Sequence, residues 1–114
     1  MINEILTAAD IPSKPARFPD PPALHAVYFD SPGTPDFNPD LGPALNVTHD
    51  CTVELYAPSI KAGIEARKRL LRALDERSIR YTTQGWYWLN AIQRYQDIIE
   101  FSYIKKTGGM NNEN

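Results

Sequence analysis

The sequence has one cysteine, no long apolar run and no long run of one charge, and each shortage excludes a class of protein. Because Cys51 is the only cysteine among 114 residues, neither an intrachain disulfide nor a cysteine-rich zinc site can form. No segment approaches the ~20 apolar residues of a membrane-spanning helix, and the first residues lack the pattern of a signal peptide. We therefore expect a soluble protein without a membrane partner, assembled in a reducing cytoplasm.

The motifs that carry common chemistries are also missing. There is no G-x-G-x-x-G, P-loop, H-E-x-x-H or G-x-S-x-G sequence. The two histidines, His25 and His49, fall on strands that could be neighbours, so a two-histidine site is conceivable. A zinc site needs three or more protein ligands, and no third ligand is obvious. His49 lies in a core-facing row, where we expect a buried, hydrogen-bonded imidazole rather than a ligand. We expect no catalytic residue, no metal and no cofactor, and hence no enzyme.

The charge pattern does not indicate nucleic-acid binding. The net charge is −2, and no run of Lys or Arg forms a basic footprint. Residues 1–44 carry six acids and two bases (−4), whereas residues 45–114 carry eight acids and ten bases (+2). We expect no specific nucleic-acid partner, and the acidic and basic halves would suit head-to-tail contacts between subunits.

Proline is concentrated in the first half, where nine of ten prolines lie between residues 12 and 43. Each proline fixes φ and removes a backbone donor, so any strand there is short or peripheral. Residues 23–30 are the proline-free apolar run and predict the first strand. Residues 31–44 predict a long Pro/Gly-rich loop, which is unusual in a compact domain unless functional or flexible. Phe37 and Leu41 within it are candidates for a subunit or partner interface.

Strict alternation over residues 45–56 predicts a strand with one buried face. Cys51 lies in the apolar row and is expected to be a small buried residue. Asp50 and Glu54 lie in the polar row. Paired carboxylates can perform acid–base chemistry. Here we expect them to keep a sheet face solvated or to meet basic residues of a neighbouring subunit.

Residues 60–77 predict the main helix, with Ser59 as its N-cap. Its apolar stripe consists of Ile60, Gly63, Ile64, Leu70, Leu71 and Leu74. A short helix is predicted near residues 2–9, and strands are predicted at 79–83, 86–92 and 95–105. The order of elements predicts an α+β domain over residues 1–106, with a mostly antiparallel sheet of four or five strands and the main helix on one face. Residues 107–114 are expected to be a disordered tail.

Trp86 and Trp88 would share one face of a strand if it alternates. They are core or boundary residues in one interpretation. In the other they form a subunit interface, where Trp is enriched. Base stacking is a third possibility, but the flanking segment has few positive charges.

The segment from His49 to Pro58, with Val53-Glu54-Leu55-Tyr56 at its centre, precedes a charged helix, Tyr81 and a strand pair ending at Tyr103. This order resembles the small tail-completion proteins of long-tailed bacteriophages, which are tail terminators or head–tail joining proteins. The resemblance covers roughly residues 2–105 and brings no catalytic residue with it.

The resemblance implies a structural virion protein at the head–tail interface. It would form a homo-oligomeric ring, commonly a hexamer, that ends the tail tube and meets the head connector proteins. A ring needs two different surfaces on each subunit. The alternative is a small α+β adaptor or nucleic-acid-binding module.

Overall fold

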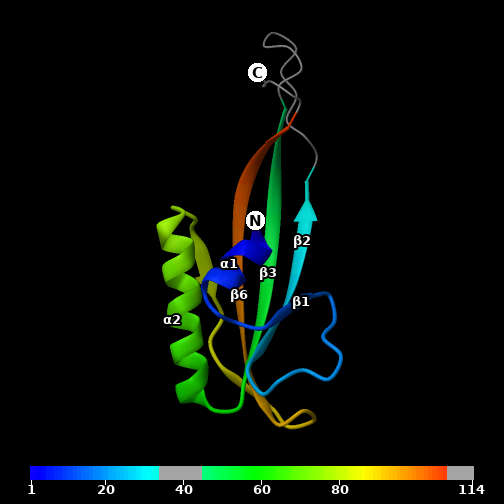
Figure 1. The fold of residues 1–114 in the computed structure, drawn as a ribbon, viewed down its shortest axis with the longest axis vertical. Helices are drawn as coiled ribbons and strands as arrows, with labels where there is room; N and C mark the ends of the chain where they lie inside the picture. The colour runs from blue at the N-terminus through cyan, green and yellow to red at the C-terminus, as the bar shows by residue number, and fades with distance from the viewer. Residues whose placement is uncertain (34–44, 108–114) are drawn as a thin grey trace.

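A computed structural model describes residues 1–33 and 45–107, which form two helices and six strands. In chain order the elements are α1 (Ile2–Ala8), β1 (Ser13–Pro15), β2 (His25–Pro32), β3 (Leu45–Ala57), α2 (Ile60–Glu76), β4 (Tyr81–Thr83), β5 (Tyr87–Leu89) and β6 (Arg94–Thr107) (Figure 1). The α+β class and the mostly antiparallel sheet are confirmed. The sheet has six strands rather than four or five because the three-residue strand β1, which was not predicted, also pairs with it.

The sheet order is β1-β2-β3-β6-β4, and β5 pairs with β6 beside this path. Only β1 and β2 run parallel, and every other pair is antiparallel. The two longest strands, β3 and β6, pair from Leu45 with Thr107 to Ala57 with Tyr95. Their far ends extend beyond both helices, which gives an elongated molecule of 53 × 25 × 23 Å (Figure 1).

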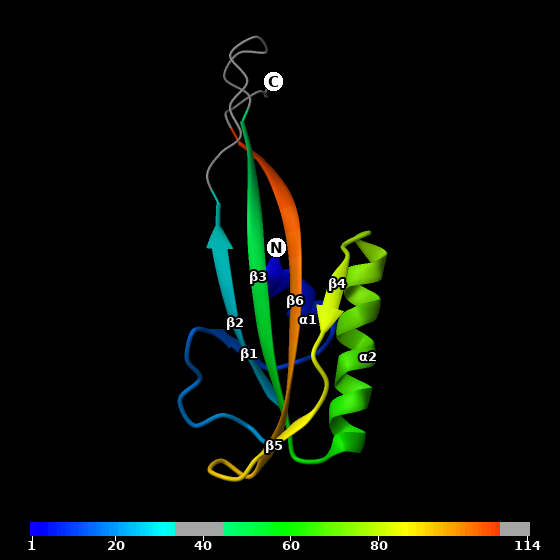
Figure 2. The ribbon, with the colours of Figure 1, turned by 180° about the vertical axis from the view of Figure 1, so that it is seen from behind.

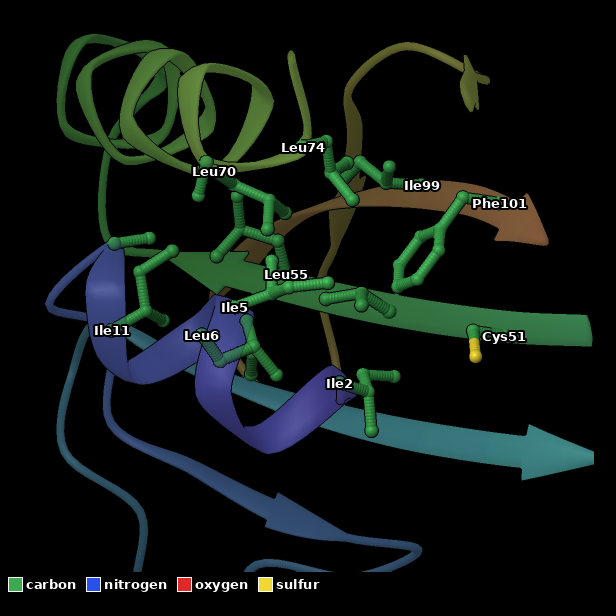
Figure 3. Packing of buried hydrophobic residues seen from close by; sticks show 14 of the residues in the cluster. Ile2, Ile5, Leu6, Ile11, Cys51, Leu55, Leu70, Leu74, Ile99 and Phe101 are labelled. Carbon is green, nitrogen blue, oxygen red and sulfur yellow. The ribbon is translucent and has the colours of Figure 1, made fainter. Parts of the chain in front are cut away.

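Both helices cover the same face of the sheet. The side chains of Cys51, Val53 and Leu55 on β3 are buried against them, as the alternation predicts. The core is completed by side chains from both helices, which pack against these strand residues: Ile5 and Leu6 of α1, and Leu70 and Leu74 of α2 (Figure 3). The opposite face carries no helix, and Figure 2 shows it with α1 behind the strands. The molecule therefore has two layers and one sheet face without a helix.

The main helix begins and ends nearly where the sequence predicts. Ser59 is the N-cap, and its Oγ accepts a hydrogen bond from the amide of Ala62 at 3.1 Å. The buried line differs from the predicted stripe, since Ile60 is 43% exposed. The residues buried in the helix are mostly small, which lets α2 approach its neighbours closely: Gly63, Ala66, Leu70, Ala73 and Leu74.

Two predicted boundaries move because strand pairing extends further than expected. Pro32, expected in the long loop, belongs to β2, and the Gly33 amide still bonds to the Thr48 carbonyl at 2.8 Å. Thr107, expected in the tail, belongs to β6. The rest of the predicted loop, with Phe37 and Leu41, lies outside the described residues. Residues 108–114 of the predicted tail lie outside them as well.

Candidate functional site

The helix-free sheet face carries three carboxylates around Thr52. Asp50 and Glu54 lie two residues to either side of Thr52 on β3, and Glu100 of β6 is directly opposite Thr52 in the antiparallel register. We call Asp50, Glu54 and Glu100 the acidic patch. Ser102 donates a hydrogen bond to Asp50 at 2.6 Å. None of the three acids forms an ion pair within residues 1–33 and 45–107.

Apolar side chains flank the acidic patch on the same face. Phe29 of β2 is paired with Thr52 and is 40% exposed, and Ile104 of β6 is paired with Thr48 and is 64% exposed. An open notch of about 730 Å³ borders the patch near β4, with Arg80 on its lining. This mixture of unpaired acid and exposed apolar surface suits a protein partner better than a phosphate-bearing one.

The outer face of α2 has the opposite charge. At 100° per residue, Lys61, Lys68 and Arg72 project within a narrow arc directly opposite the buried line of the helix. All three are exposed, and we call them the basic stripe. Glu65 is the one acid between them on this arc. The stripe and the acidic patch therefore lie on opposite sides of the two-layer molecule.

The turn between β5 and β6 forms an aromatic tip at the end of the molecule that lies near the start of α2 (Figure 2). Tyr87 is 64% exposed, Trp88 45% and Ile92 49%, and we define the tip by these three residues. Trp88 contacts the ring of Tyr95 at 4.8 Å between centroids. Gln93 donates side-chain hydrogen bonds within the turn, so the tip is held by local contacts.

Trp86 has a different environment from Trp88. Its indole lies against α2 so closely that a Cβ on Gly63 would be 2.5 Å from Cη2. The guanidinium of Arg67 lies 5.4 Å from the centre of the indole. Trp86 Nε1 is buried and has no hydrogen-bond partner among the described residues. The structure thus places Trp86 in an intramolecular contact, and Trp88 is the tryptophan that is available to a partner.

Arg67 also forms an ion pair that the sequence analysis missed. Its Nη1 donates to Oδ2 of Asp97 at 2.8 Å, and Asp97 is fully buried on the core side of β6. The other carboxylate oxygen accepts a hydrogen bond from the Gly85 amide at 2.9 Å. Gly85 has φ +100°, a conformation that glycine adopts without strain. The one signal in the sequence was an aspartate in an otherwise apolar row of β6.

The two histidines lie on opposite faces of the sheet, so they cannot form one site. His25 is buried near the helix-free face, where its Nδ1 is 2.8 Å from the Pro22 carbonyl and its ring stacks on Tyr56. Burial lowers the pKa of His25, which favours the neutral ring. His25 is therefore a buried, hydrogen-bonded imidazole, whereas His49, for which the sequence predicts that state, is only partly buried.

His49 belongs to a polar cluster at the edge of the core. Its Nδ1 lies 2.7 Å from Oδ1 of Asp30, and its ring stacks on Tyr103 at 4.8 Å. Tyr103 donates to the second oxygen of Asp30 at 3.3 Å. Cys51 is 2% exposed beside this cluster, and burial, followed by the charge of Asp30, raises its pKa to about 12. A thiol with so high a pKa is a poor nucleophile at neutral pH.

Within residues 1–33 and 45–107, no three His, Cys, Asp or Glu side chains are grouped so that they could hold a metal ion. No helix in the same ranges is long and apolar enough to span a membrane.

Of the predicted interface residues, the structure leaves three accessible and separates them into two surfaces. Asp50 and the half-buried Glu54 share the helix-free face, and Trp88 lies on the aromatic tip. The sequence analysis did not select Glu100, although its alternation with Phe101 in β6 places it on the polar side. Tyr87 of β5 and Ile92 of the turn after it are further exposed residues that the sequence pattern did not single out.

Comparison with known proteins does not assign the chain to a family. No protein-family model matches the sequence, and no curated protein is detectably similar to it.

Proposed function

We propose that this chain is a structural virion protein that forms a ring at the end of a phage tail tube and joins it to the head connector. The observation that carries the proposal is the placement of three surfaces on different sides of one elongated subunit. The acidic patch, the basic stripe and the aromatic tip occupy the sheet face, the helix face and one end. A ring subunit needs two unlike lateral surfaces and at least one end that docks onto another component.

The composition of these surfaces supports protein partners. The aromatic tip exposes Tyr87 and Trp88, and Tyr and Trp are enriched at interface hot spots. Its position at one end suits the tail tube protein or the head connector proteins, whereas lateral faces suit further copies of the chain. A nucleic-acid-binding module is the weaker alternative, because the helix-free face would repel phosphates.

The experiment uses the full chain and the tail tube protein encoded nearest to it in its genome. We expect electron microscopy to show rings at the ends of assembled tubes, and light scattering to show a mass increase when tubes are added to the chain. A gene located between capsid and tail-tube genes would agree with this. A chain that stays monomeric at high concentration and does not bind tubes would contradict the proposal. Steep salt-dependent retention of DNA in a filter-binding assay would favour the alternative.

A further inference from the structure

We infer that the contact between neighbouring copies joins the acidic patch of one copy to the basic stripe on α2 of the next. The inference rests on the proposed ring and specifies its lateral interface. The occupant of the helix-free sheet face is therefore a second copy of this chain. The two surfaces belong to opposite layers of one molecule, so the contact is heterologous and each copy presents both halves of it.

The two surfaces match in height along the molecule. β3 ends at Ala57 and α2 begins at Ile60, so distances from this shared end can be compared directly. At ~3.3 Å per strand residue, Glu54 lies about 10 Å from the end of β3. Glu100, opposite Thr52, lies about 17 Å from it. At 1.5 Å per helical residue, Lys68 and Arg72 lie about 12 and about 18 Å from the start of α2.

In a ring, acidic and basic residues at equal heights along the molecule can meet across the contact between neighbouring copies. Both α2 and the long strands follow the long axis of the molecule (Figures 1 and 2). A rotation about an axis parallel to the strands moves each residue sideways without changing its height. Lys68 of one copy then meets Glu54 of its neighbour, and Arg72 meets Glu100. No shift along the axis is needed, so the contact adds no helical rise, which is one requirement of a closed ring.

In the described part of the chain no ion pair engages these charges, although Arg80 borders the acidic patch and Glu65 lies one turn from Lys68. Glu100, Lys68 and Arg72 are exposed and form no ion pair among residues 1–33 and 45–107. Three neighbouring carboxylates repel one another, and a cationic surface removes that repulsion. Phe29 and Ile104 beside the patch would exclude water from the contact, which strengthens the attraction compared with a fully solvated pair. Added salt should weaken the association.

The test reverses one charge on each surface. In Glu100→Lys, residue 100 faces Arg72 of the neighbour, and in Arg72→Glu, residue 72 faces Glu100. Each variant alone should weaken self-association at least tenfold, measured by sedimentation equilibrium of the full chain at low salt. A 1:1 mixture should associate as wild type does, because both contacts in an alternating ring are again complementary. The doubly reversed chain should also recover.

Two control variants change the net charge equally at exposed positions away from both surfaces. Glu4→Lys is the control for Glu100→Lys, and Lys105→Glu is the control for Arg72→Glu. Both controls should associate as wild type does. Circular dichroism confirms that each variant is folded. Recovery in the mixture is independent evidence of folding, because a misfolded partner cannot restore association.

Three outcomes would overturn the inference: wild-type chain that stays monomeric at millimolar concentration and low salt, reversals no more disruptive than their controls, or a mixture that does not recover. These outcomes are distinct from failure of the proposed function. A wild-type ring that tolerates the reversals refutes this interface and leaves the ring intact. Binding of the chain to tail-tube ends is measured separately and decides the proposed function.

Discussion

At the scale of single residues, the least expected feature is a charged group in the centre of the core. Asp97 is fully buried and is matched by one guanidinium N–H and one backbone N–H. Arg67, which supplies the first, remains 25% exposed. The pairing could not be predicted because the partners are 30 residues apart and their meeting depends on how α2 lies on β6.

The Arg67–Asp97 pair predicts an asymmetry between its two single variants. Arg67→Met leaves a carboxylate in the core with one donor and should lower the free energy of unfolding by about 3–5 kcal/mol. Asp97→Asn leaves the partly hydrated Arg67 and should cost less, about 1–3 kcal/mol. Urea unfolding followed by circular dichroism measures both. Arg72→Met on the exposed side of the same helix is the control, and a loss at Arg67 no larger than at Arg72 would contradict the pairing.

Cys51 predicts a dependence of stability on alkaline pH. Its pKa is raised to about 12 in the folded protein, mainly by burial, whereas an unfolded thiol ionises near pH 9. Above pH 9 the unfolded chain therefore loses a proton that the folded chain keeps, and the free energy of unfolding should fall as pH rises toward 12. Cys51→Ala should make this decline shallower. In the native protein, Cys51 should also resist a thiol reagent at pH 8 and react once denaturant is added.

At the scale of elements, α2 is held by a contact between a glycine and a tryptophan from another part of the chain. Periodicity alone predicts the helix and its N-cap, since both depend on neighbouring residues. Periodicity finds Gly63, Leu70 and Leu74 but misses Ala66 and Ala73, because large residues carry most of the apolar signal. The reason lies in Trp86, whose ring occupies the space beside Gly63.

Gly63→Ala should therefore destabilise the protein, although the same change in an exposed helix would stabilise it by up to about 1 kcal/mol. The new Cβ would meet three ring atoms of Trp86 at 2.5–2.9 Å, so the ring must move. We expect a loss of about 1–3 kcal/mol, typical of overpacking. Thermal unfolding measures the effect. In a Trp86→Leu background, the same Gly63→Ala change should cost clearly less, and an equal cost in both backgrounds would rule out the steric explanation.

The short strands show where local patterns stop being informative. β1 has three residues, too few for alternation to be recognised, and it exists because β2 offers paired positions beside it. β5 lies inside the predicted strand 86–92, but only Tyr87–Leu89 pair with β6. The long strands β3 and β6 were predictable because each carries many alternating positions. Their register was not, since it depends on contacts between residues that are far apart in sequence.

At the scale of the whole molecule, the structure separates residues that hold the fold together from residues that are free to bind. The sequence places Trp86 and Trp88 two positions apart and predicts one shared role. The tertiary structure divides them, because Trp86 lies against Gly63 of α2, whereas Trp88 in β5 lies at the tip and is 45% exposed. Which sheet face lacks a helix is likewise decided by how the chain folds back on itself.

This separation predicts opposite phenotypes for the two tryptophans. Trp86→Ala removes a ring packed on Gly63 and Arg67 and should lower the free energy of unfolding by about 3–5 kcal/mol. Trp88→Ala removes a ring that is 45% exposed and should cost about 1 kcal/mol, chiefly through its contact with Tyr95. For binding to tail-tube ends we expect the opposite order, with the larger effect from Trp88→Ala, because the aromatic tip is proposed to dock there. Trp88→Ala should weaken binding to tail-tube ends at least tenfold at a temperature where it is fully folded.

Tyr87 gives a second test of docking by the aromatic tip, because it lies on the same tip and is even more exposed than Trp88. If the tip docks as a unit, Tyr87→Ala should weaken binding to tube ends without changing the unfolding midpoint. Chemical denaturation and a tube-pelleting assay on the same preparations measure the two effects independently. Wild-type binding by both tip variants would show that the tip does not dock, and would move the docking surface to the opposite end of the long strands.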